Sequence, residues 1–366
     1  MKLELSDSEL EIYARQIALK DIGYDGQLRL RNSTACVLGL GGLGSKIALQ
    51  LVGMGVGHLR IVDRDIVSRV DLHRQYLYDT GSIGRPKVEV AFAKLKLLNP
   101  ETELIAFPES LNSMNAAEII AGADIVLDGL DRPEVRYVVN RTCVKYGVPY
   151  VFGAAIQAHG NISTIVPGQT FCLECFRPGR RNDDSLKAAV VGVDPSVLGI
   201  VASVQVSEAV RLLTHRQPNL LNKLMYIDLR ELSFRIFGGN RQEKCPVCGT
   251  NPIDHAEPFS EKYLEETCAK DGSRSFVITP KRRIEIDLER LSNLLHKRGF
   301  PIKSMGMFGI TFEKSSDVTV CFLRRGTMVA QASSRATGPL KDDLLGSYRS
   351  LLVDGLNLAE DILPNF

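Results

Sequence analysis

The chain has little net charge, because its 45 lysines and arginines nearly balance its 43 aspartates and glutamates, which leaves a formal charge of +2. This balance argues against binding to nucleic acids or membrane surfaces by bulk electrostatics. No uncharged apolar run reaches the roughly 18 residues that a membrane span needs. The N-terminus, MKLELSDSELEIYARQ, is acidic and amphipathic and does not resemble a signal peptide. We therefore expect a cytoplasmic protein that binds neither membranes nor nucleic acids.

Histidine is also scarce, and the six histidines show no spacing typical of a metal site. Four of the eight cysteines, in contrast, form two CxxC pairs: Cys172 with Cys175, and Cys245 with Cys248. Two such pairs supply four thiolates for a closed tetrahedral zinc site, which is structural because no ligand position stays open. Disulfides or a redox CxxC are the alternatives, but this cysteine pattern favours zinc in a reducing compartment.

Glycine is concentrated in residues 34–65. A short apolar run at residues 35–38 predicts a buried parallel strand, a glycine-rich turn and a helical pattern follow, and a second apolar run ends at Asp63. This βαβ unit is typical of a nucleotide site, in which phosphate meets a helix N-terminus and an acid lies near a ribose. The turn lets the backbone approach the phosphates. Its glycines are Gly39, Gly41, Gly42 and Gly44.

Several residues beyond this unit also suggest an anion site at the same sheet edge. Residues 65–78 form a polar loop, and Lys87 begins a predicted helix at residues 87–98. A cation at a helix N-terminus is unfavourable unless an anion is nearby, so Lys87 hints at a bound anion. Asp128 and Asp131 lie between a predicted strand and a helix at residues 133–146. They either cap that helix or bind a magnesium–phosphate complex.

The length of 366 residues allows two or three domains. The fold class that we predict is α/β, a Rossmann-like doubly wound sheet with a zinc knuckle, followed by a small α+β domain. The predicted boundaries are residues 1–250 for the nucleotide-binding domain, 251–272 for a linker with one loose helix, and 273–366 for the C-terminal domain. The apolar helix at residues 195–213 is predicted to belong to the core.

The ordered motifs YARQI, GLGGLGSKIALQLVGMGVGHLRIVDRD, DLHRQYLY, GRPKVEVA and DGLDRPEVRYVVN, with the two CxxC pairs, resemble the ubiquitin-activating superfamily. The most similar members are homodimeric adenylyltransferases that activate the sulfur carriers of molybdopterin and thiamine synthesis, and some prokaryotic members carry an extra C-terminal domain. The resemblance implies that ATP and Mg²⁺ are used to adenylate the C-terminal glycine of a ubiquitin-fold carrier that ends in Gly-Gly, with release of pyrophosphate. A carboxylate nucleophile needs no general base, because it is already ionised at neutral pH.

The resemblance also implies roles for particular residues. Asp63 would bind the ribose, the four glycines would face the phosphates, and Asp131 would organise Mg²⁺. Arg74 and Lys87 would bind the phosphates, and Asp65 and Asp71 would complete the nucleotide site. Arg15 would reach across a homodimer into the neighbouring site, although a lone arginine on a surface helix is otherwise simply a solvated charge.

Three positions depart from the family pattern. Asp71 and Arg132 each stand where asparagine is usual, and Ser185 stands near the place of a thioester cysteine. A serine hydroxyl is hardly ionised without a base, so it is a poor substitute. If a thioester forms at all, Cys268 in the predicted linker is the weak candidate. We predict adenylation without an obligatory enzyme thioester.

Three other functions share part of this pattern. An enzyme of the same fold could adenylate a peptide end or a tRNA base, an NAD-dependent oxidoreductase would share the βαβ unit, and a partner subunit could have lost its chemistry. The oxidoreductase does not explain Arg15, the cysteine pairs or the set formed by Arg74, Lys87 and Asp131. A non-catalytic subunit would not need that set either. The sequence does not identify the carrier, the later fate of the adenylate or the role of the C-terminal domain.

Overall fold

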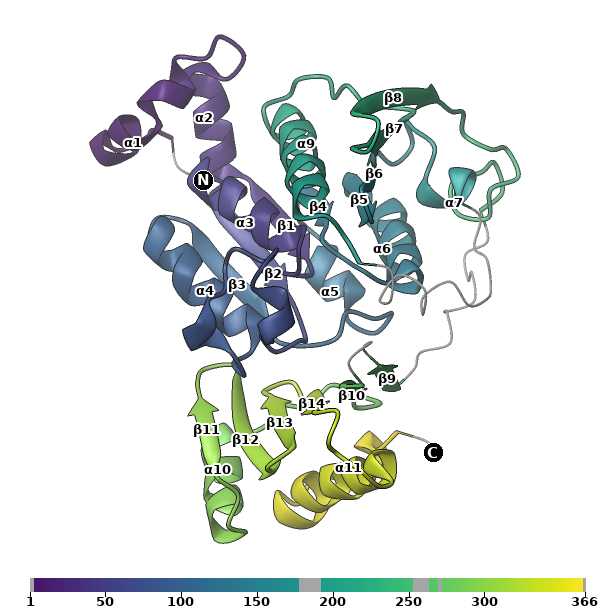
Figure 1. The fold of residues 1–366 in the computed structure, drawn as a ribbon. Coiled ribbons are helices and arrows are strands. Elements are labelled where there is room, and N and C mark those ends of the chain that lie inside the picture. Colours follow the sequence, from purple (N-terminus) through teal and green to yellow (C-terminus); the bar gives the residue numbers. More distant parts are fainter. Residues whose placement is uncertain (1–2, 178–191, 253–262, 269–271, 365–366) are drawn as a thin grey trace.

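The computed structural model describes residues 3–177, 192–252, 263–268 and 272–364. Two sheets organise these residues, and the smaller one lies below the larger one in Figure 1. The first sheet has eight strands in the order β3-β2-β1-β4-β5-β6-β7-β8. Strands β1 to β5 are parallel, whereas β6, β7 and β8 continue the sheet in antiparallel fashion. The predicted Rossmann-like α/β fold is confirmed.

The strands of the first sheet are β1 (Thr34–Leu38), β2 (His58–Val62), β3 (Glu103–Phe107), β4 (Ile125–Asp128), β5 (Tyr150–Ile156), β6 (His159–Ile165), β7 (Lys223–Asp228) and β8 (Ser233–Gly238). Its helices are α1 (Asp7–Ile17), α2 (Gly23–Asn32), α3 (Gly44–Gly53), α4 (Lys87–Leu98), α5 (Ala116–Ile120), α6 (Pro133–Tyr146), α7 (Leu173–Phe176) and α9 (Pro195–Leu213). Short 3-10 turns at Arg69–Asp71 and Thr80–Ser82 interrupt the loop between β2 and α4.

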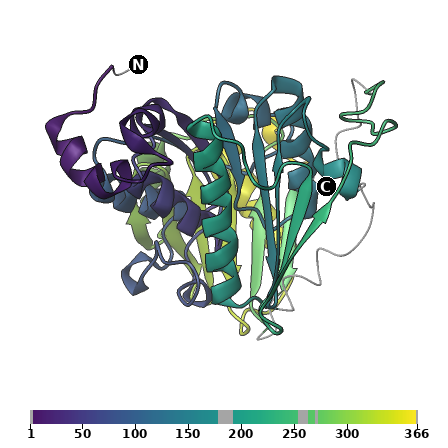
Figure 2. The same ribbon diagram turned by 90° about the horizontal axis from the view of Figure 1, so that it is seen from above.

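Strand residues alternate between two cores, as expected for strands buried on both faces. Ala35 and Val37 of β1 belong to the core that contains α3, α4 and α9, whereas Cys36 and Leu38 belong to the core with α5 and α6. Figure 2 shows α9 lying along one face of the sheet. Among the described residues, α9 is the one helix long and apolar enough to cross a membrane, yet 56% of that apolar window is buried against the protein.

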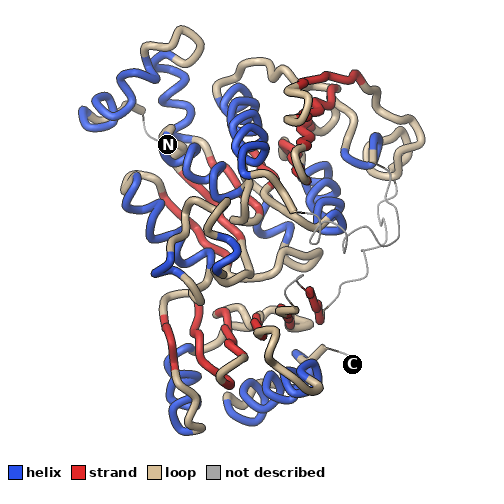
Figure 3. The backbone as a smooth tube through the Cα atoms, in the orientation of Figure 1, coloured by secondary structure: helices blue, strands red, loops and turns tan. Residues whose placement is uncertain are grey.

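The second sheet is antiparallel and has six strands in the order β11-β12-β13-β14-β10-β9. Its strands are β9 (Leu264–Cys268), β10 (Arg274–Ile278), β11 (Ile302–Met305), β12 (Gly309–Ser315), β13 (Val318–Leu323) and β14 (Met328–Ala332). Helices α10 (Leu288–Lys297) and α11 (Leu340–Arg349) pack on one face, and α11 continues into a π-helical turn at Ser350–Gly355 and a 3-10 turn at Glu360–Ile362. Figure 3 shows these helices and strands as separate layers.

The other face of the second sheet packs on the first domain. Ile66, which follows β2, joins a small buried cluster with Val277, Cys321, Leu323 and Val329. Cys321 is a buried core residue on β13, as predicted. The C-terminal domain therefore lies against the loops that follow the parallel strands, which is the edge where open α/β sheets bind ligands.

Several local predictions are wrong. Leu264–Cys268 is a strand of the second sheet, paired with β10, and is not part of a linker with a loose helix. Gly153 and Gly160 do not break their strands, because they pair within β5 and β6. In both cases, pairing with the adjacent strand of the same hairpin outweighed the local composition. Residues 253–262 and 269–271 of the predicted linker lie outside the described residues, as does Ser185.

Candidate functional site

The glycine turn after β1 is shaped for close backbone approach. Gly39 has φ +84°, and a Cβ there would lie 2.7 Å from the carbonyl oxygen of Gly129. A Cβ on Gly44 would collide with the Gly39 carbonyl. A Cβ on Gly42 would lie 2.7 Å from the Leu198 side chain, whereas a Cβ on Gly41 would have no neighbour nearer than the Gln75 amide nitrogen at 3.9 Å. The turn therefore leaves room at Gly41, beside the N-terminus of α3, for a group such as a phosphate.

Asp63 ends β2 and faces this turn. Its carboxylate accepts hydrogen bonds from the backbone amides of Leu40 (2.6 Å) and Asp65 (2.7 Å). Burial and the neighbouring charge of Asp65 raise the pKa of Asp63 to about 6, against the opposing effect of Lys87 and of those two amides. Asp63 therefore lies at the carboxyl end of β2, where the sequence predicts an acid, and Asp65 lies two residues further along the chain.

Lys87 begins α4 and is buried among carboxylates. Its Nζ lies 3.2 Å from Asp65 Oδ2 and 3.7 Å from Asp71 Oδ2. Burial alone would lower the pKa of Lys87, but Asp65, Asp71 and Asp63 raise it above its ordinary value. The sequence predicts an anion near Lys87, and the carboxylates of Asp65 and Asp71 supply it within the chain. This pairing was not predicted, because the anion was expected to be a bound triphosphate.

Asp71 stands where asparagine is usual in the family, and its negative charge is balanced by neighbouring cations and hydrogen-bond donors. Besides Lys87, its carboxylate accepts hydrogen bonds from Arg74 (3.1 Å), Gln75 (2.8 Å) and Ser68. The extra negative charge is therefore paired with Arg74 and Lys87. Gln75 Oε1 is buried with no hydrogen-bond partner among the described residues. An unpaired buried oxygen beside Gly41 fits a site that a polar ligand completes.

The loop after β4 separates its two aspartates. Asp128 is buried and accepts hydrogen bonds from Arg136 (2.9 Å), Tyr150 (2.5 Å) and the Leu130 amide (2.9 Å), so it is a structural residue that fixes this loop. Asp131 is exposed, on the turn before α6. Asp131 is thus the aspartate of this pair that is free to approach a metal ion, as the prediction for Mg²⁺ requires.

Two other predicted residues do not join this group. Arg15 is exposed on α1, which lies at the top left of Figure 1, away from the loops that face the C-terminal domain. Leu10 and Ile12 of the same helix are exposed as well, whereas Tyr13 is buried. Cys268 is exposed on β9, and strand alternation places it on the face opposite Glu265. A thioester role for Cys268 stays a prediction that the structure does not test.

Sequence reasoning missed Lys46 near the glycine turn. Its Nζ donates to the carbonyls of Gly42 (3.1 Å) and Arg74 and lies 4.1 Å from the centre of the Tyr76 ring. Burial and the nearby Arg74 charge lower the pKa of Lys46 to about 8. The reasoning that singled out Lys87 applies to Lys46 as well, because Lys46 is also a cation in the first turn of a helix.

The four cysteines of the CxxC pairs come together at one end of the sheet. Their Sγ atoms all lie within 4.8 Å of one another, with Cys172 3.6 Å from Cys245 and Cys175 3.3 Å from Cys248. A tetrahedron of thiolates about 2.3 Å from zinc has sulfurs roughly 3.8 Å apart. All eight cysteines are described and none forms a disulfide. The cluster can hold a metal ion, as the two CxxC pairs predict.

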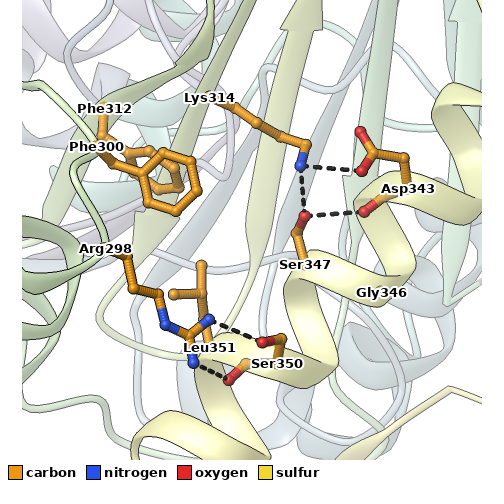
Figure 4. Close-up of a pocket in the computed structure, with 9 residues that line it drawn as sticks. All are labelled: Arg298, Phe300, Phe312, Lys314, Asp343, Gly346, Ser347, Ser350 and Leu351. Carbon is orange, nitrogen blue, oxygen red and sulfur yellow. Dashed lines mark hydrogen bonds and ion pairs between the residues drawn. The ribbon is translucent and has the colours of Figure 1, made fainter.

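A separate cavity of about 360 Å³ lies in the C-terminal domain, between β12 and α11 (Figure 4). Lys314 on its wall contacts Asp343 (3.0 Å) and Ser347 (2.8 Å), and Arg298 donates to the Ser350 hydroxyl (2.7 Å). Lys314 forms an ion pair within the domain, and Arg298 is bound to Ser350. The residues that line this cavity all belong to the C-terminal domain, so the cavity is separate from the site at the carboxyl edge of the first sheet.

Comparison with known proteins decides the family. Residues 13–247 match the ThiF family. The chain belongs to the ThiF family. The resemblance predicted from the motifs is thereby confirmed, and the matched range includes the glycine turn and both CxxC pairs except Cys248.

Two relatives of this ThiF-family chain have informative names. The "SAMP-activating enzyme E1" of Haloferax volcanii is 34% identical over 273 residues, which is 74% of this chain and 98% of the relative. The "Sulfur carrier protein adenylyltransferase" of Thermus thermophilus is 38% identical over 253 residues, 67% of this chain and 92% of the relative. Both names describe activating enzymes, which agrees with the predicted enzyme class.

Solved structures share the fold of this ThiF-family chain. Escherichia coli MccB, crystallised with ATP, matches with a TM-score of 0.60 at 22% identity, over 68% of this chain and 75% of that one. At this identity the match concerns the fold alone.

Proposed function

We propose that this protein uses ATP and Mg²⁺ to adenylate the C-terminal glycine of a ubiquitin-like or sulfur-carrier protein, with release of pyrophosphate. The observation that carries the proposal is the group of charges around the open glycine turn. Lys87, Arg74 and Lys46 lie there with Asp63, and Asp131 is on the neighbouring loop. The family and the names of both relatives support the same reaction class.

The chemistry needs positioning and spread positive charge. A carrier carboxylate oxygen attacks the α-phosphorus of ATP, the bond to the bridging oxygen breaks, and pyrophosphate leaves with the electron pair. Arg74 and Lys87 would stabilise the charge that develops on the phosphates. Asp63 would orient the ribose, and the turn at Gly41 would donate backbone amides. Asp131 would hold Mg²⁺, which supplies further charge neutralisation when it is bound.

A protein acceptor is supported by an exposed apolar strand. On the edge strand β8 and the turn before it, Leu232, Phe234, Ile236 and Phe237 are each at least half exposed. Exposed clusters of large apolar side chains mark protein interaction sites more often than small-molecule sites. A ubiquitin-fold carrier could cover this strand while its C-terminus reaches the nucleotide.

The proposed active unit is a homodimer. Arg15 is exposed on α1 next to Ile12, which is 60% exposed, and Leu19 just beyond the helix is 54% exposed. A second copy of the chain would cover these exposed apolar side chains, which are otherwise left in contact with water. The second copy would receive Arg15 into its site. We also propose a cytoplasmic location, based on eight free cysteines.

ATP–pyrophosphate exchange tests the function directly. Labelled pyrophosphate should enter ATP only when a ubiquitin-fold protein ending in Gly-Gly is present, because the carrier carboxylate must attack before pyrophosphate can return. A carrier that lacks its last glycine is the matched control and should give no exchange. Measurable ATP binding without exchange for any carrier would instead support adenylation of a peptide end or a tRNA base.

The cysteine cluster should bind one structural zinc ion. Cys175→Ser should remove the zinc and lower the Tm by about 5 °C or more, because one thiolate of a closed tetrahedral site is lost. Elemental analysis and thermal unfolding measure both effects. Cys268→Ser is the matched control, since Cys268 is exposed and does not belong to the cluster. Unchanged zinc content in Cys175→Ser would contradict the proposed site.

A further inference from the structure

Glu265 of the C-terminal domain binds two arginines of the first domain. Its carboxylate accepts a two-pronged interaction from Arg64, at 2.6 and 2.7 Å, and a third hydrogen bond from Arg132 at 2.6 Å. The three side chains are only 15–23% exposed. Charge-assisted and bidentate contacts of this kind are the strong ones in proteins. They cross between β9 and the loops after β2 and β4.

Both arginines lie directly beside the acids of the candidate nucleotide site. Arg64 stands between Asp63 and Asp65 in sequence, and its Nε is 3.9 Å from Asp65 Oδ1. Arg132 directly follows Asp131. Against the effect of burial, Glu265, Asp65 and Asp131 raise the pKa of Arg64. Against the same effect, Lys87, Arg64 and Arg132 lower the pKa of Asp65. The two arginines and the two acids therefore form one electrostatic group.

The neighbouring contacts fix β9 and β10 over this group. Ser110, which follows β3, hydrogen-bonds Thr279 at 3.0 Å, and Arg283 pairs with Glu109 through two hydrogen bonds. The buried cluster around Ile66 adds an apolar contact. The packing of the C-terminal domain against the first domain therefore holds Glu265 beside Arg64 and Arg132.

We propose that Glu265 is a positioning residue of the nucleotide site, which binds Arg64 and Arg132 so that Asp65 and Asp131 stay available for Mg²⁺ and ATP. The inference rests on the proposed function for the identity of the ligand. Without Glu265, both guanidinium groups would lose their carboxylate partner and would be released to pair more closely with the acids beside them in the chain, Asp65 next to Arg64 and Asp131 next to Arg132. They would then compete with the metal ion. The nucleotide site would then be built from both domains, and Arg132, which stands where asparagine is usual, is one of the two arginines that pair with Glu265.

Equilibrium ATP binding, measured by calorimetry across a Mg²⁺ titration, tests this inference. In Glu265→Gln, which keeps the side-chain shape, the Mg²⁺ concentration for half-maximal ATP binding should rise about 10-fold. Adding Arg132→Asn to Glu265→Gln should reverse much of that rise, because the released cation is removed. Glu266→Gln is the matched control, since Glu266 is the exposed neighbour on the opposite face of β9, and it should match the unmodified protein.

The outcomes separate this inference from the proposed function. An unchanged Mg²⁺ requirement in Glu265→Gln would overturn the inference while leaving the function intact. A raised requirement that Arg132→Asn does not reverse would also overturn it, since Glu265 would then act only by holding the domains together. An unmodified protein that binds no ATP, with or without Mg²⁺, would instead count against the proposed function itself.

Discussion

Lys87→Ala should lower the rate of carrier-dependent ATP–pyrophosphate exchange by about 10³-fold. A preorganised donor at a developing charge contributes roughly 10²–10³-fold on its own. Here the loss is larger, because Lys87 also neutralises Asp65 and Asp71, with Nζ 3.2 and 3.7 Å from their carboxylates. Without it, these acids would repel the triphosphate. Steady-state exchange with varied ATP should show a raised KM as well as a lowered kcat.

The matched control is Lys94→Ala on the same helix. Lys94 forms an exposed ion pair with Asp79, two helical turns along α4 from Lys87. Its loss should change the exchange rate less than twofold, since exposed ion pairs contribute little. Circular dichroism should confirm that both variants are folded, because removing one partner of a buried ion pair costs about 3–5 kcal/mol. A folded Lys87→Ala that keeps a tenth of the activity would contradict the assigned role.

The second large effect concerns two inactive variants that should restore each other. Arg15→Ala and Asp131→Ala should each abolish exchange, because Arg15 would act in the neighbouring site and Asp131 in its own. Mixed as equal amounts with subunit exchange, they should recover about a quarter of the activity. Half of the dimers are then mixed, and each mixed dimer has one complete site. The measurement is exchange activity after mixing, with subunit exchange followed by differently tagged chains.

A second mixture provides the control for this experiment. Lys87→Ala and Asp131→Ala alter the same site within one chain, so every site of a mixed dimer contains one of the two changes and no activity should return. Recovery in this control would show that the two residues do not share a site. Confirmed subunit exchange without recovery for Arg15→Ala and Asp131→Ala would show that Arg15 does not act across a dimer.

Much of the fold was predictable from local patterns. The predicted helices at residues 87–98 and 133–146 are α4 and α6, and the strand at residues 103–107 is β3. These elements carry a clear start, such as Pro133, or a clear stop, such as Asn99. Strand β9 was missed because polar residues alternate weakly there, and its place depends on pairing with β10. Helix α2 was also missed, since its glycines and charges give no apolar period.

The sequence by itself determined the glycine turn, the acid at the end of β2, the cysteine pairs and the family, because each depends on neighbours within a few residues or on a motif read in order. The tertiary structure decided which charges are partners. It paired Lys87 with Asp65 and Asp71, it removed Asp128 from the possible metal ligands by burying it against Arg136, and it brought Glu265 to Arg64 and Arg132. These pairings join segments up to 201 residues apart, and Coulomb interactions depend on distance and burial in space, which no local pattern encodes.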